Sequence, residues 1–548
     1  MNMSARTAKL LAESPLRHRS FRQFYTGSVG TALGYTMQAA MAAWLMGTLT
    51  PSALMVALVQ TASTAPFLLF GLIAGSLADI MNKRKLIVIT QLVMLLSTAG
   101  LGAIAVTGHV GPASVLLLTF LCGAAFTFYM PAQQSSINDL VSRADLPRAV
   151  ALGAVAFNVA RAVGPAIAGA IAAWVGSGSA LLASSIFFVL MIFGVRSLKT
   201  VEKALPGVPE TLFAGVKSGL RFARHSPAMR SLVILNLSFT VCASALWALL
   251  PLVARDQLGL GPGGYGLLFG TFGTGAVVCA LTIPTQLQRR PLNTVVRGSV
   301  VVWIAATLLI SASEITVIAL VGALFAGAAW VGVLASLSAG TQSTAPAWVR
   351  ARAVSINLMA LQSGLAVGSF LWGMLAGTID VRMTLAVSAA VMLGLYALNH
   401  RVYVELGKEA DVTPFTQMPE LAIKVEPMPD DGPVLVQVEY RVDEDLRPAF
   451  LHAIQAVEAT RRRNGAYSWR VFRDLADDGR FVERYVLTSW AEYVRLRMRM
   501  TVADRHLQTR MLEMQRKDVP IRVSRLIGVS PSEMPPRSDY SPVPAEDP

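Results

Sequence analysis

Long apolar segments are the feature that most constrains this chain. Runs of about twenty apolar residues, the length that crosses a bilayer as a helix, recur from about Phe24 to about Tyr403, and charged residues lie mostly between them. Because a segment in lipid must satisfy its own backbone hydrogen bonds, each run predicts a helix. We predict an all-α polytopic membrane region with 12 transmembrane helices, at residues 24–49, 53–78, 86–108, 112–131, 149–173, 178–196, 229–253, 264–287, 293–313, 315–340, 353–378 and 382–403.

The composition supports a membrane protein. The 548 residues are 54% hydrophobic and only 15% charged, whereas soluble domains carry about a quarter charged residues. This excludes a wholly soluble enzyme. The first apolar run is longer than the apolar part of a signal peptide, and further runs follow it, so we expect no cleavable leader.

Basic residues alternate between the connectors. One set of connectors holds Arg17, Arg19, Arg22, Lys83, Arg84, Lys85, Arg143, Arg148, Lys199, Lys203, Lys217, Arg221, Arg224, Arg289, Arg290, Arg350 and Arg352, and the other holds little besides Arg255 and Arg382. Basic connectors stay in the cytoplasm, so we expect a multi-pass protein of the bacterial inner membrane with both termini cytoplasmic. The net charge is +14, and the basic residues that produce it flank the membrane spans. We therefore expect membrane lipid and a small-molecule substrate as partners, and no nucleic acid.

The spans are predicted to form two six-helix pseudo-repeat halves. The segment that begins at Arg148 aligns without a gap with the segment that begins at Arg352; both share an Arg-Ala-Val start, a Val-Gly pair and a final glycine. Repeated halves with a site between them are a transporter architecture. The predicted organisation is a cytoplasmic segment (1–20), an N-terminal half (21–196), an amphipathic linker (197–228), a C-terminal half (229–403), a second linker (404–431), a soluble domain (432–529) and a disordered tail (530–548).

Small residues recur every four positions in the fifth and eleventh spans. They are Ala160, Gly164 and Ala168 in one, and Ala360, Gly364 and Gly368 in the other. Such ridges let helices pack closely in lipid. Packing alone explains these ridges as well as a functional role does, and we predict Ala160, Gly164, Pro165, Gly169, Gly364 and Gly368 to be helix-packing residues.

Arg161 is the most informative polar residue within a span. It follows apolar residues in the fifth span, and Asn158 lies three positions before it on the same helix face. A charge at this depth is costly and usually faces a bundle interior or a wet cavity. We predict a role in substrate handling or gating; a purely structural hydrogen bond is the alternative.

Other polar and aromatic residues at span depth predict a lightly polar, aromatic binding cavity. With Arg161, the predicted substrate-binding residues are Gln38, Phe126, Tyr129, Asn158, Asn236, Trp247, Trp330 and Gln362, and Trp44 is a further aromatic of this kind. Taken singly, each is better explained as a packing or interfacial residue than as a ligand contact, and only the set as a whole predicts the cavity.

Three further observations concern energy and cofactors. No aspartate or glutamate lies clearly at mid-membrane depth. Proton-coupled carriers often relay protons through a buried carboxylate, so the sequence does not identify the coupling ion. No phosphate-binding loop of the Walker type occurs. Cys122, Cys242 and Cys279 lie in apolar runs as packing residues, without disulfide or metal spacing, and we expect no metal or cofactor.

The turn between the second and third spans resembles the signature of the major facilitator superfamily. It reads Gly75-Ser-Leu-Ala-Asp79-Ile-Met-Asn82-Lys83-Arg84-Lys85, and the signature has a glycine, a small-aliphatic pair, an aspartate, then a glycine and two or three bases. Ile80 replaces a usual base, and Asn82 replaces the turn glycine; asparagine tolerates the same left-handed conformation.

Gly164-Pro165-x-x-Ala168-Gly169 is similar to the span-five motif of drug antiporters. The wider pattern from Pro131 to Gly169 is similar to the bacterial exporters that include the enterobactin exporter. That branch often has an acidic residue after a glycine in span one, where this chain has Tyr35 after Gly34. The resemblance covers roughly residues 15–403 and implies a secondary carrier.

The resemblance also implies a cytoplasmic gate. Asp79 would lie against the start of span eleven, whose free N–H groups favour negative charge, near Arg352, or would pair with Arg143 or Arg148. The implied gating residues are Gly75, Asp79, Lys83, Arg84, Arg143, Arg148 and Arg352. Lys83 to Lys85 also serve as a simple topology signal.

From about Gly432 the composition is that of a soluble domain. Alternating patterns predict strands at 434–442, on both sides of the Asp477-Asp478-Gly479 turn and at 520–529, and amphipathic patterns predict helices at 444–463 and 491–515. This β-α-β-β-α-β order is the α+β ferredoxin-like pattern. It is similar to small dimeric domains of the antibiotic-biosynthesis-monooxygenase type, which implies a possible homodimer.

We therefore predict a secondary active transporter that exports a small organic molecule, siderophore-like or lipophilic and drug-like, by alternating access with proton antiport. The soluble domain is expected to serve dimerisation or regulation. His452, Trp469 and His506 leave open an active monooxygenase-like enzyme domain instead. The same spans are also compatible with a small-molecule importer or with a membrane sensor.

Overall fold

The chain folds into two compact units. The structure is a computed structural model, and it describes residues 15–142, 145–197, 212–346, 348–399, 412–413, 415, 423 and 427–529. One unit comprises residues 1–212, 231–341 and 354–406, and the other comprises residues 213–230, 342–353 and 407–548.

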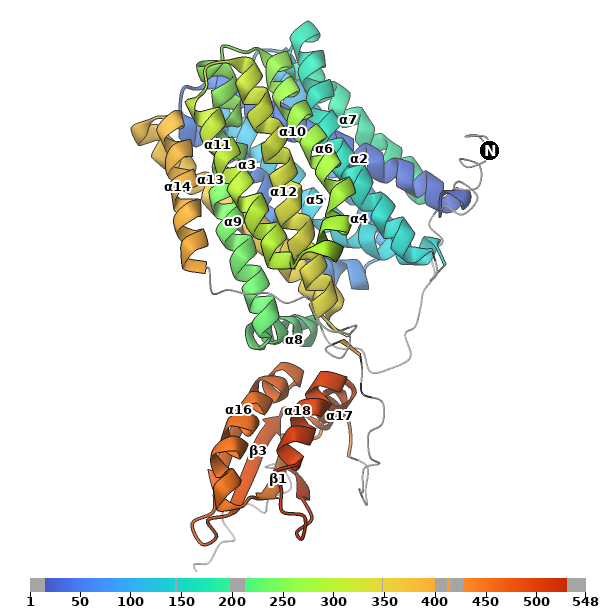
Figure 1. Ribbon diagram of the computed structural model, residues 1–548. Helices are drawn as coiled ribbons and strands as arrows, with labels where there is room; N and C mark the ends of the chain where they lie inside the picture. Colours follow the sequence, from blue (N-terminus) through green and yellow to red (C-terminus); the bar gives the residue numbers. More distant parts are fainter. Residues whose placement is uncertain are drawn as a thin grey trace, which may run out of the picture. The chain divides into compact units, whose positions relative to one another are not determined.

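Long helices form the first unit (Figure 1). The N-terminal half contains α2 (Arg19–Leu49), α3 (Ala53–Ile80), α4 (Lys83–Val106), α5 (Pro112–Leu140), α6 (Leu146–Val175) and α7 (Ser177–Gly194). The C-terminal half contains α9 (Pro227–Leu252), α10 (Pro262–Arg289), α11 (Leu292–Ala312), α12 (Thr316–Thr344), α13 (Arg350–Ile379) and α14 (Val381–Leu398). Each helix covers most or all of one predicted span.

Among the described residues, eleven helices are long and apolar enough to cross a membrane. The helix α2 is not among them; it is 31 residues long, but glycine, threonine, serine and glutamine lower its apolarity. The mostly helical membrane fold is therefore confirmed, while the number of twelve spans stays a prediction that depends on α2.

Asn82 lies in the turn between α3 and α4. Its backbone has φ −57° and ψ 112°, so it does not adopt the left-handed conformation that asparagine would tolerate there. Asn82 instead caps α4, and its side-chain oxygen accepts a hydrogen bond from the N–H of Lys85 at 3.3 Å. An N-cap needs this non-helical conformation to bring its side chain over the first turn.

In both halves, a threonine of the first helix packs against small residues of the fifth helix. The hydroxyl of Thr36 on α2 donates to the carbonyl of Ala160 on α6 at 2.9 Å, and a Cβ atom added at Gly164 would collide with Thr36. On α9, Thr240 lies against Gly364 of α13, which is the position equivalent to Ala160 in the internal repeat. The offset that aligns Arg148 with Arg352 also aligns Thr36 with Thr240, so the internal repeat appears in side-chain packing as well as in sequence.

The two halves meet through small residues as well. Gly169 of α6 faces Gly266 of α10, where an added Cβ would lie 2.9 Å from the Gly266 Cα, and Gly266 faces the carbonyl of Pro165. In the equivalent place, Gly373 of α13 lies against Ala57 of α3. Contacts of this type bring α6 and α13 close to helices of the opposite half.

The second unit contains α8 (Leu212–His225) and a C-terminal α+β domain. The strands are β1 (Val434–Arg441), β2 (Ser468–Arg473), β3 (Arg480–Leu487) and β4 (Arg522–Ile527), and the helices are α16 (Arg447–Asn464), α17 (Trp490–Met498) and α18 (Val502–Leu512). The strand order is β2-β3-β1-β4, and every pair is antiparallel, with Val434 opposite both Leu487 and Ile527. The small sheet is therefore confirmed.

The predicted single helix at 491–515 is wrong, because the chain forms α17 and α18. Thr501 begins α18: its side chain accepts from the Asp504 N–H, and the Asp504 carboxylate accepts from the Thr501 N–H. This reciprocal capping box stabilises a new helix start and interrupts the apolar pattern.

The core of the domain lies between the sheet and its helices. Alternate residues of β1 are buried, namely Val434, Val436, Val438 and Tyr440, and they join Phe450 of α16 in one apolar cluster. Glu483 of β3 is fully buried in this core. It accepts hydrogen bonds from Arg461 at 3.0 Å, Tyr440 at 3.0 Å and Trp469 at 3.0 Å, so its charge is compensated.

Candidate functional site

Arg161 lies at the centre of an aromatic cluster contributed by both halves. Its guanidinium carbon is 5.0 Å from the ring centre of Phe157 on α6, 5.6 Å from Trp247 on α9 and 5.9 Å from Trp330 on α12. Trp247 and Trp330 pack against each other with ring centres 5.1 Å apart. A cation at these distances is attracted to the ring faces. The sequence prediction grouped three of these four residues.

The aromatic cluster continues into the N-terminal half. Phe157 packs against Phe126 of α5 at 6.2 Å, and Phe126 stacks on Tyr35 of α2 at 3.9 Å with an interplanar angle of 8°. Phe126 and Trp330 occupy equivalent positions of the internal repeat. Sequence reasoning noticed Tyr35 only as the replacement of an expected acid, and missed that its ring extends the cluster.

The Arg161 side chain has no anionic partner among the described residues. Four carboxylates near the helix ends are bound elsewhere: Asp139 to Lys83 at 2.7 Å, Asp145 to Arg17 at 3.0 Å, Asp256 to Arg255 and Glu314 to Arg382 at 2.8 Å. A fifth, Asp380 before the start of α14, is exposed. The site is therefore a positive charge enclosed by aromatic faces.

Three other predicted substrate-binding residues lie in helix contacts. Gln38 donates to Thr119 of α5 at 3.3 Å. Asn236 donates to the side chain of Asn357 on α13 at 2.8 Å. Tyr129 is buried in the apolar cluster of the N-terminal half. The Gln38 and Asn236 contacts hold neighbouring helices together, whereas the Tyr129 ring packs against Phe126 of the aromatic cluster, with ring centres 6.0 Å apart.

Asn158 and Gln362 are both partly buried. They align in the internal repeat, Asn158 on α6 and Gln362 on α13. Trp44, on α2, stacks on Tyr265 of α10 at 5.4 Å and so lies in the contact between halves.

The predicted gate is described only in part. The Asp79 side chain and all of Arg143 lie outside the described residues. Lys83 pairs with Asp139 of α5, Arg84 is exposed, and an added Cβ at Gly75 would meet no atom within 4 Å.

Two further gating residues lie in different units. Arg148 lies in the first turn of α6, in the first unit, and has contacts of its own. Arg352 belongs to the second unit, and it donates to the Ser218 hydroxyl of α8 at 2.7 Å.

A carboxylate that the gate prediction did not include is Asp145, before the start of α6. It accepts hydrogen bonds from Ser142 at 3.0 Å and from Arg17 at 3.0 Å. The Ser142 hydrogen bond, and then the Arg17 charge, lower the pKa of Asp145 below its ordinary value, although burial opposes the change. This contact fixes the N-terminal segment to the start of α6.

The second unit contains an arginine-rich contact that the sequence did not predict. Arg221 of α8 donates to Glu492 of α17 at 2.7 Å, and Arg499 donates to the same oxygen at 2.8 Å. The Arg499 guanidinium also lies 4.5 Å from the ring centre of Trp348, which packs edge-on against Phe222 of α8. These contacts attach α8 and the segment before α13 to the C-terminal domain.

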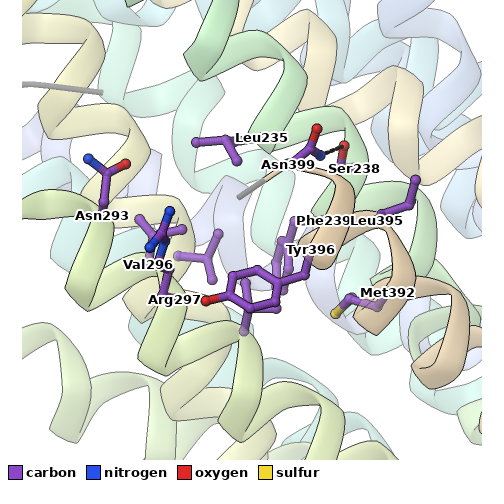
Figure 2. A pocket seen from close by; sticks show the side chains of 12 residues that line it. Leu235, Ser238, Phe239, Asn293, Val296, Arg297, Met392, Leu395, Tyr396 and Asn399 are labelled. Atoms are coloured by element: carbon purple, nitrogen blue, oxygen red, sulfur yellow. Dashed lines mark hydrogen bonds between the residues drawn. The ribbon is translucent and has the colours of Figure 1, made fainter. Parts of the chain in front are cut away.

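A small cavity of about 40 Å³ lies between α9, α11, α12 and α14 (Figure 2). Tyr396 and Met392 of α14 and Leu235 of α9 surround it, and Asn399 donates to Ser238 at its edge. Arg297 of α11 is a further lining residue. Sequence reasoning missed this cavity, although an arginine one turn inside the ninth span is the kind of signal that identified Arg161. Among the described residues, no group of His, Cys, Asp and Glu could hold a metal.

Comparisons with known proteins agree with this architecture. The sequence model of the family described as transmembrane secretion effector matches residues 11–533. The multidrug efflux pump Tap of Mycolicibacterium fortuitum is 29% identical over 205 residues, which are 36% of this chain and 50% of that protein. The staphyloferrin A transporter of Staphylococcus aureus is 25% identical over 252 residues, 45% of this chain and 62% of that protein. The matches thus span half to three fifths of these relatives.

Solved structures share the fold at low sequence identity. The nucleoside transporter NupG has a TM-score of 0.57 at 14% identity, covering 70% of this chain and 98% of that one. A bacterial homologue of the human lysosomal transporter Spinster, in an inward-facing and unoccupied conformation, has a TM-score of 0.55 at 14% identity, covering 71% and 98%. Together with the match over residues 11–533, the long helices and the repeated halves lead to one conclusion: the chain belongs to the transmembrane secretion effector family of major facilitator superfamily transporters.

Proposed function

We propose that this chain is a secondary active transporter that exports a small organic molecule across the bacterial inner membrane by alternating access, with proton antiport as its energy source. The substrate is siderophore-like or lipophilic and drug-like. The relative named as a multidrug efflux pump supports export, and the relative named as a staphyloferrin A transporter supports a siderophore-like substrate. The span-five resemblance to drug antiporters supports the antiport.

One observation carries the proposal: Arg161 of the N-terminal half reaches the Trp247 and Trp330 rings of the C-terminal half. A substrate held there contacts both halves at once. Rocking of one repeated half against the other would then expose the same site first to one side and then to the other. The close small-residue contacts of α6 with α10 and of α13 with α3 support such a movement, because they leave smooth surfaces between the halves.

We propose the cytoplasmic orientation of both termini and a gate formed by Gly75, Asp79, Lys83, Arg84, Arg143, Arg148 and Arg352. The alternation of basic connectors supports the orientation. The signature resemblance supports Asp79 as the specific part of the gate.

The C-terminal domain is proposed to be ferredoxin-like and to pair with a second copy. The strand order β2-β3-β1-β4 supports the fold. On the sheet face away from the β1 core residues, Phe472 and Leu526 are 44% and 54% exposed, which supports pairing through that face. Light scattering of the purified full chain, compared with a Phe472→Glu, Leu526→Glu variant, would detect the loss of a dimer.

Flux into inside-out vesicles tests the transport proposal, with and without a proton gradient, over a panel of siderophores and lipophilic drugs. Accumulation that requires the gradient supports proton antiport. Accumulation that ignores the gradient contradicts the antiport but retains the export. Binding without any flux would favour a membrane sensor, and gradient-driven uptake in right-side-out vesicles would favour an importer.

A further inference from the structure

We propose that the central site selects organic anions: a carboxylate-bearing molecule with a flat aromatic body, whose charged group binds between Arg161 and the Trp247 indole N–H. This inference rests on the proposed transport function and specifies its substrate class.

The first argument is the uncompensated charge. Arg161 faces three aromatic rings, and the ring faces offset only part of what a guanidinium loses when it leaves water. Four described carboxylates near the helix ends are paired with Lys83, Arg17, Arg255 and Arg382, and Asp380 is exposed. The remaining positive potential favours a ligand of opposite charge and disfavours an organic cation.

The second argument is an unused donor at the same place. The Trp247 Nε1 atom is shielded from solvent and has no hydrogen-bond acceptor in the described part of the chain. An indole nitrogen is a donor only, and a buried donor without an acceptor is costly. Because Trp247 is also one of the rings beside Arg161, a ligand carboxylate could accept from both groups with its two oxygens. A cation or an apolar hydrocarbon satisfies neither.

The third argument concerns the body of the ligand. From Arg161 the aromatic surface continues through Phe157 and Phe126 to Tyr35, and through Trp330 to Trp303 at 5.8 Å. Flat rings pack well against such surfaces in offset or edge-on geometry. The site therefore combines one anion-binding end with an apolar, aromatic surround.

Two dyes with the same ring skeleton provide a matched test. Fluorescein carries a free carboxylate and is an anion at pH 8, whereas rhodamine 6G carries an ester and is a cation. Equilibrium dialysis of the full chain in lipid nanodiscs, with empty nanodiscs as the blank, measures the affinity for each dye without requiring transport.

We expect the wild-type chain to bind fluorescein at least about tenfold more tightly than rhodamine 6G, the size of one charge-assisted hydrogen bond. Arg161→Gln is expected to weaken fluorescein binding by at least about tenfold. The affinity of this variant for rhodamine 6G should stay within about twofold of the wild-type value. Arg161→Lys should retain part of the affinity, because it keeps the charge but loses the planar fork. Trp247→Phe, which keeps a ring and removes the N–H, should weaken fluorescein by roughly threefold to tenfold.

Arg255→Gln is the control, because Arg255 pairs with Asp256 at the end of α9 and faces no ring of the cluster. Unchanged fluorescein binding in Arg161→Gln, or a wild-type preference for rhodamine 6G, overturns the inference. If Arg161→Gln does not fold, the dye preference of the wild type and the Trp247→Phe variant decide. Arg161-dependent binding without flux in proteoliposomes would contradict the transport function and leave the anion site in place. Flux that does not change in Arg161→Gln would contradict the anion site and leave the transport function in place.

Discussion

Arg221 of α8 and Glu492 of α17 form a hydrogen-bonded ion pair at 2.7 Å, although they lie far apart in the sequence. Their side chains are only 17% and 12% exposed, and Arg499 shares the same carboxylate. The pair attaches α8, which lies in the linker between the two membrane halves, to the C-terminal domain within the second unit.

The first prediction concerns the strength of this attachment. Glu492→Gln leaves Arg221 and Arg499 without their counter-charge, and breaking a largely buried pair costs about 3 kcal/mol. We expect amide hydrogen exchange to accelerate in residues 218–225 and 490–499 of the full chain. Glu458→Gln is the control, because its pair with Arg462 is about one third exposed and is worth at most about 0.5 kcal/mol. Equal exchange in both variants would contradict the attachment.

A second prediction concerns pH. Burial opposes ionisation of Glu492, but Arg499 and Arg221 outweigh it and lower the pKa of this carboxyl group below its ordinary value. A lowered pKa in the folded state gives stability that is fully present above the unfolded value and is lost as the pH falls through the folded one. The difference in thermal unfolding midpoint between wild type and Glu492→Gln should therefore be constant from pH 8 to about pH 5 and shrink below about pH 4. If the difference in unfolding midpoint instead grows towards acid pH, the pKa of Glu492 is not lowered in the folded state.

The third prediction concerns the small-residue contacts. A side chain at Gly364 collides with Thr240, whereas Gly377 on the same helix α13 has no atom within 4 Å of an added Cβ. Gly364→Val should lower the thermal midpoint of the full chain in detergent, since overpacking costs about 1–3 kcal/mol, and should reduce the monodisperse yield. Gly377→Val should remain within about 0.5 kcal/mol of the wild type. Equal loss in both variants would mean that valine in α13, and not the helix contact, is responsible.

The fourth prediction concerns the proposed gate. Asp79→Asn removes the charge but keeps the size, so we expect impaired flux with unchanged membrane insertion and yield. Asp256→Asn is the comparison and should keep wild-type flux, because Asp256 pairs with Arg255 outside the proposed gate, at a partly exposed position, where such a pair is worth at most about 1 kcal/mol. Wild-type flux in Asp79→Asn would remove Asp79 from the gate.

The sequence predicted the helices well because apolar length and turn residues are local signals. It also predicted Gly164 and Gly364 to be helix-packing residues, because small residues that recur every four positions lie on one face of a helix. The partners of those faces, Thr36 and Thr240, depend on how each helix is rotated against its neighbour, which no local pattern encodes.

In the C-terminal domain, too, local patterns were predictable and contacts between distant residues were not. The alternation in β1 was readable, but the ion pair of Arg461 with the buried Glu483 was not, because its two residues approach only after the sheet and α16 have packed. The break at Thr501 could have been found: threonine followed three positions later by Asp504 is the spacing of a capping box, and the apolar periodicity concealed it.

The matching contacts of Thr36 and Thr240 have a consequence for the history of the chain. Thr36 and Ala160 are separated by the same number of residues as Thr240 and Gly364, the residue that each threonine contacts on the fifth helix of its half. Any unbalanced insertion or deletion in the loops between those helices would have ended this equality. If one ancestral half was duplicated, those loops have kept the same total length in both copies, while the sequences on them diverged.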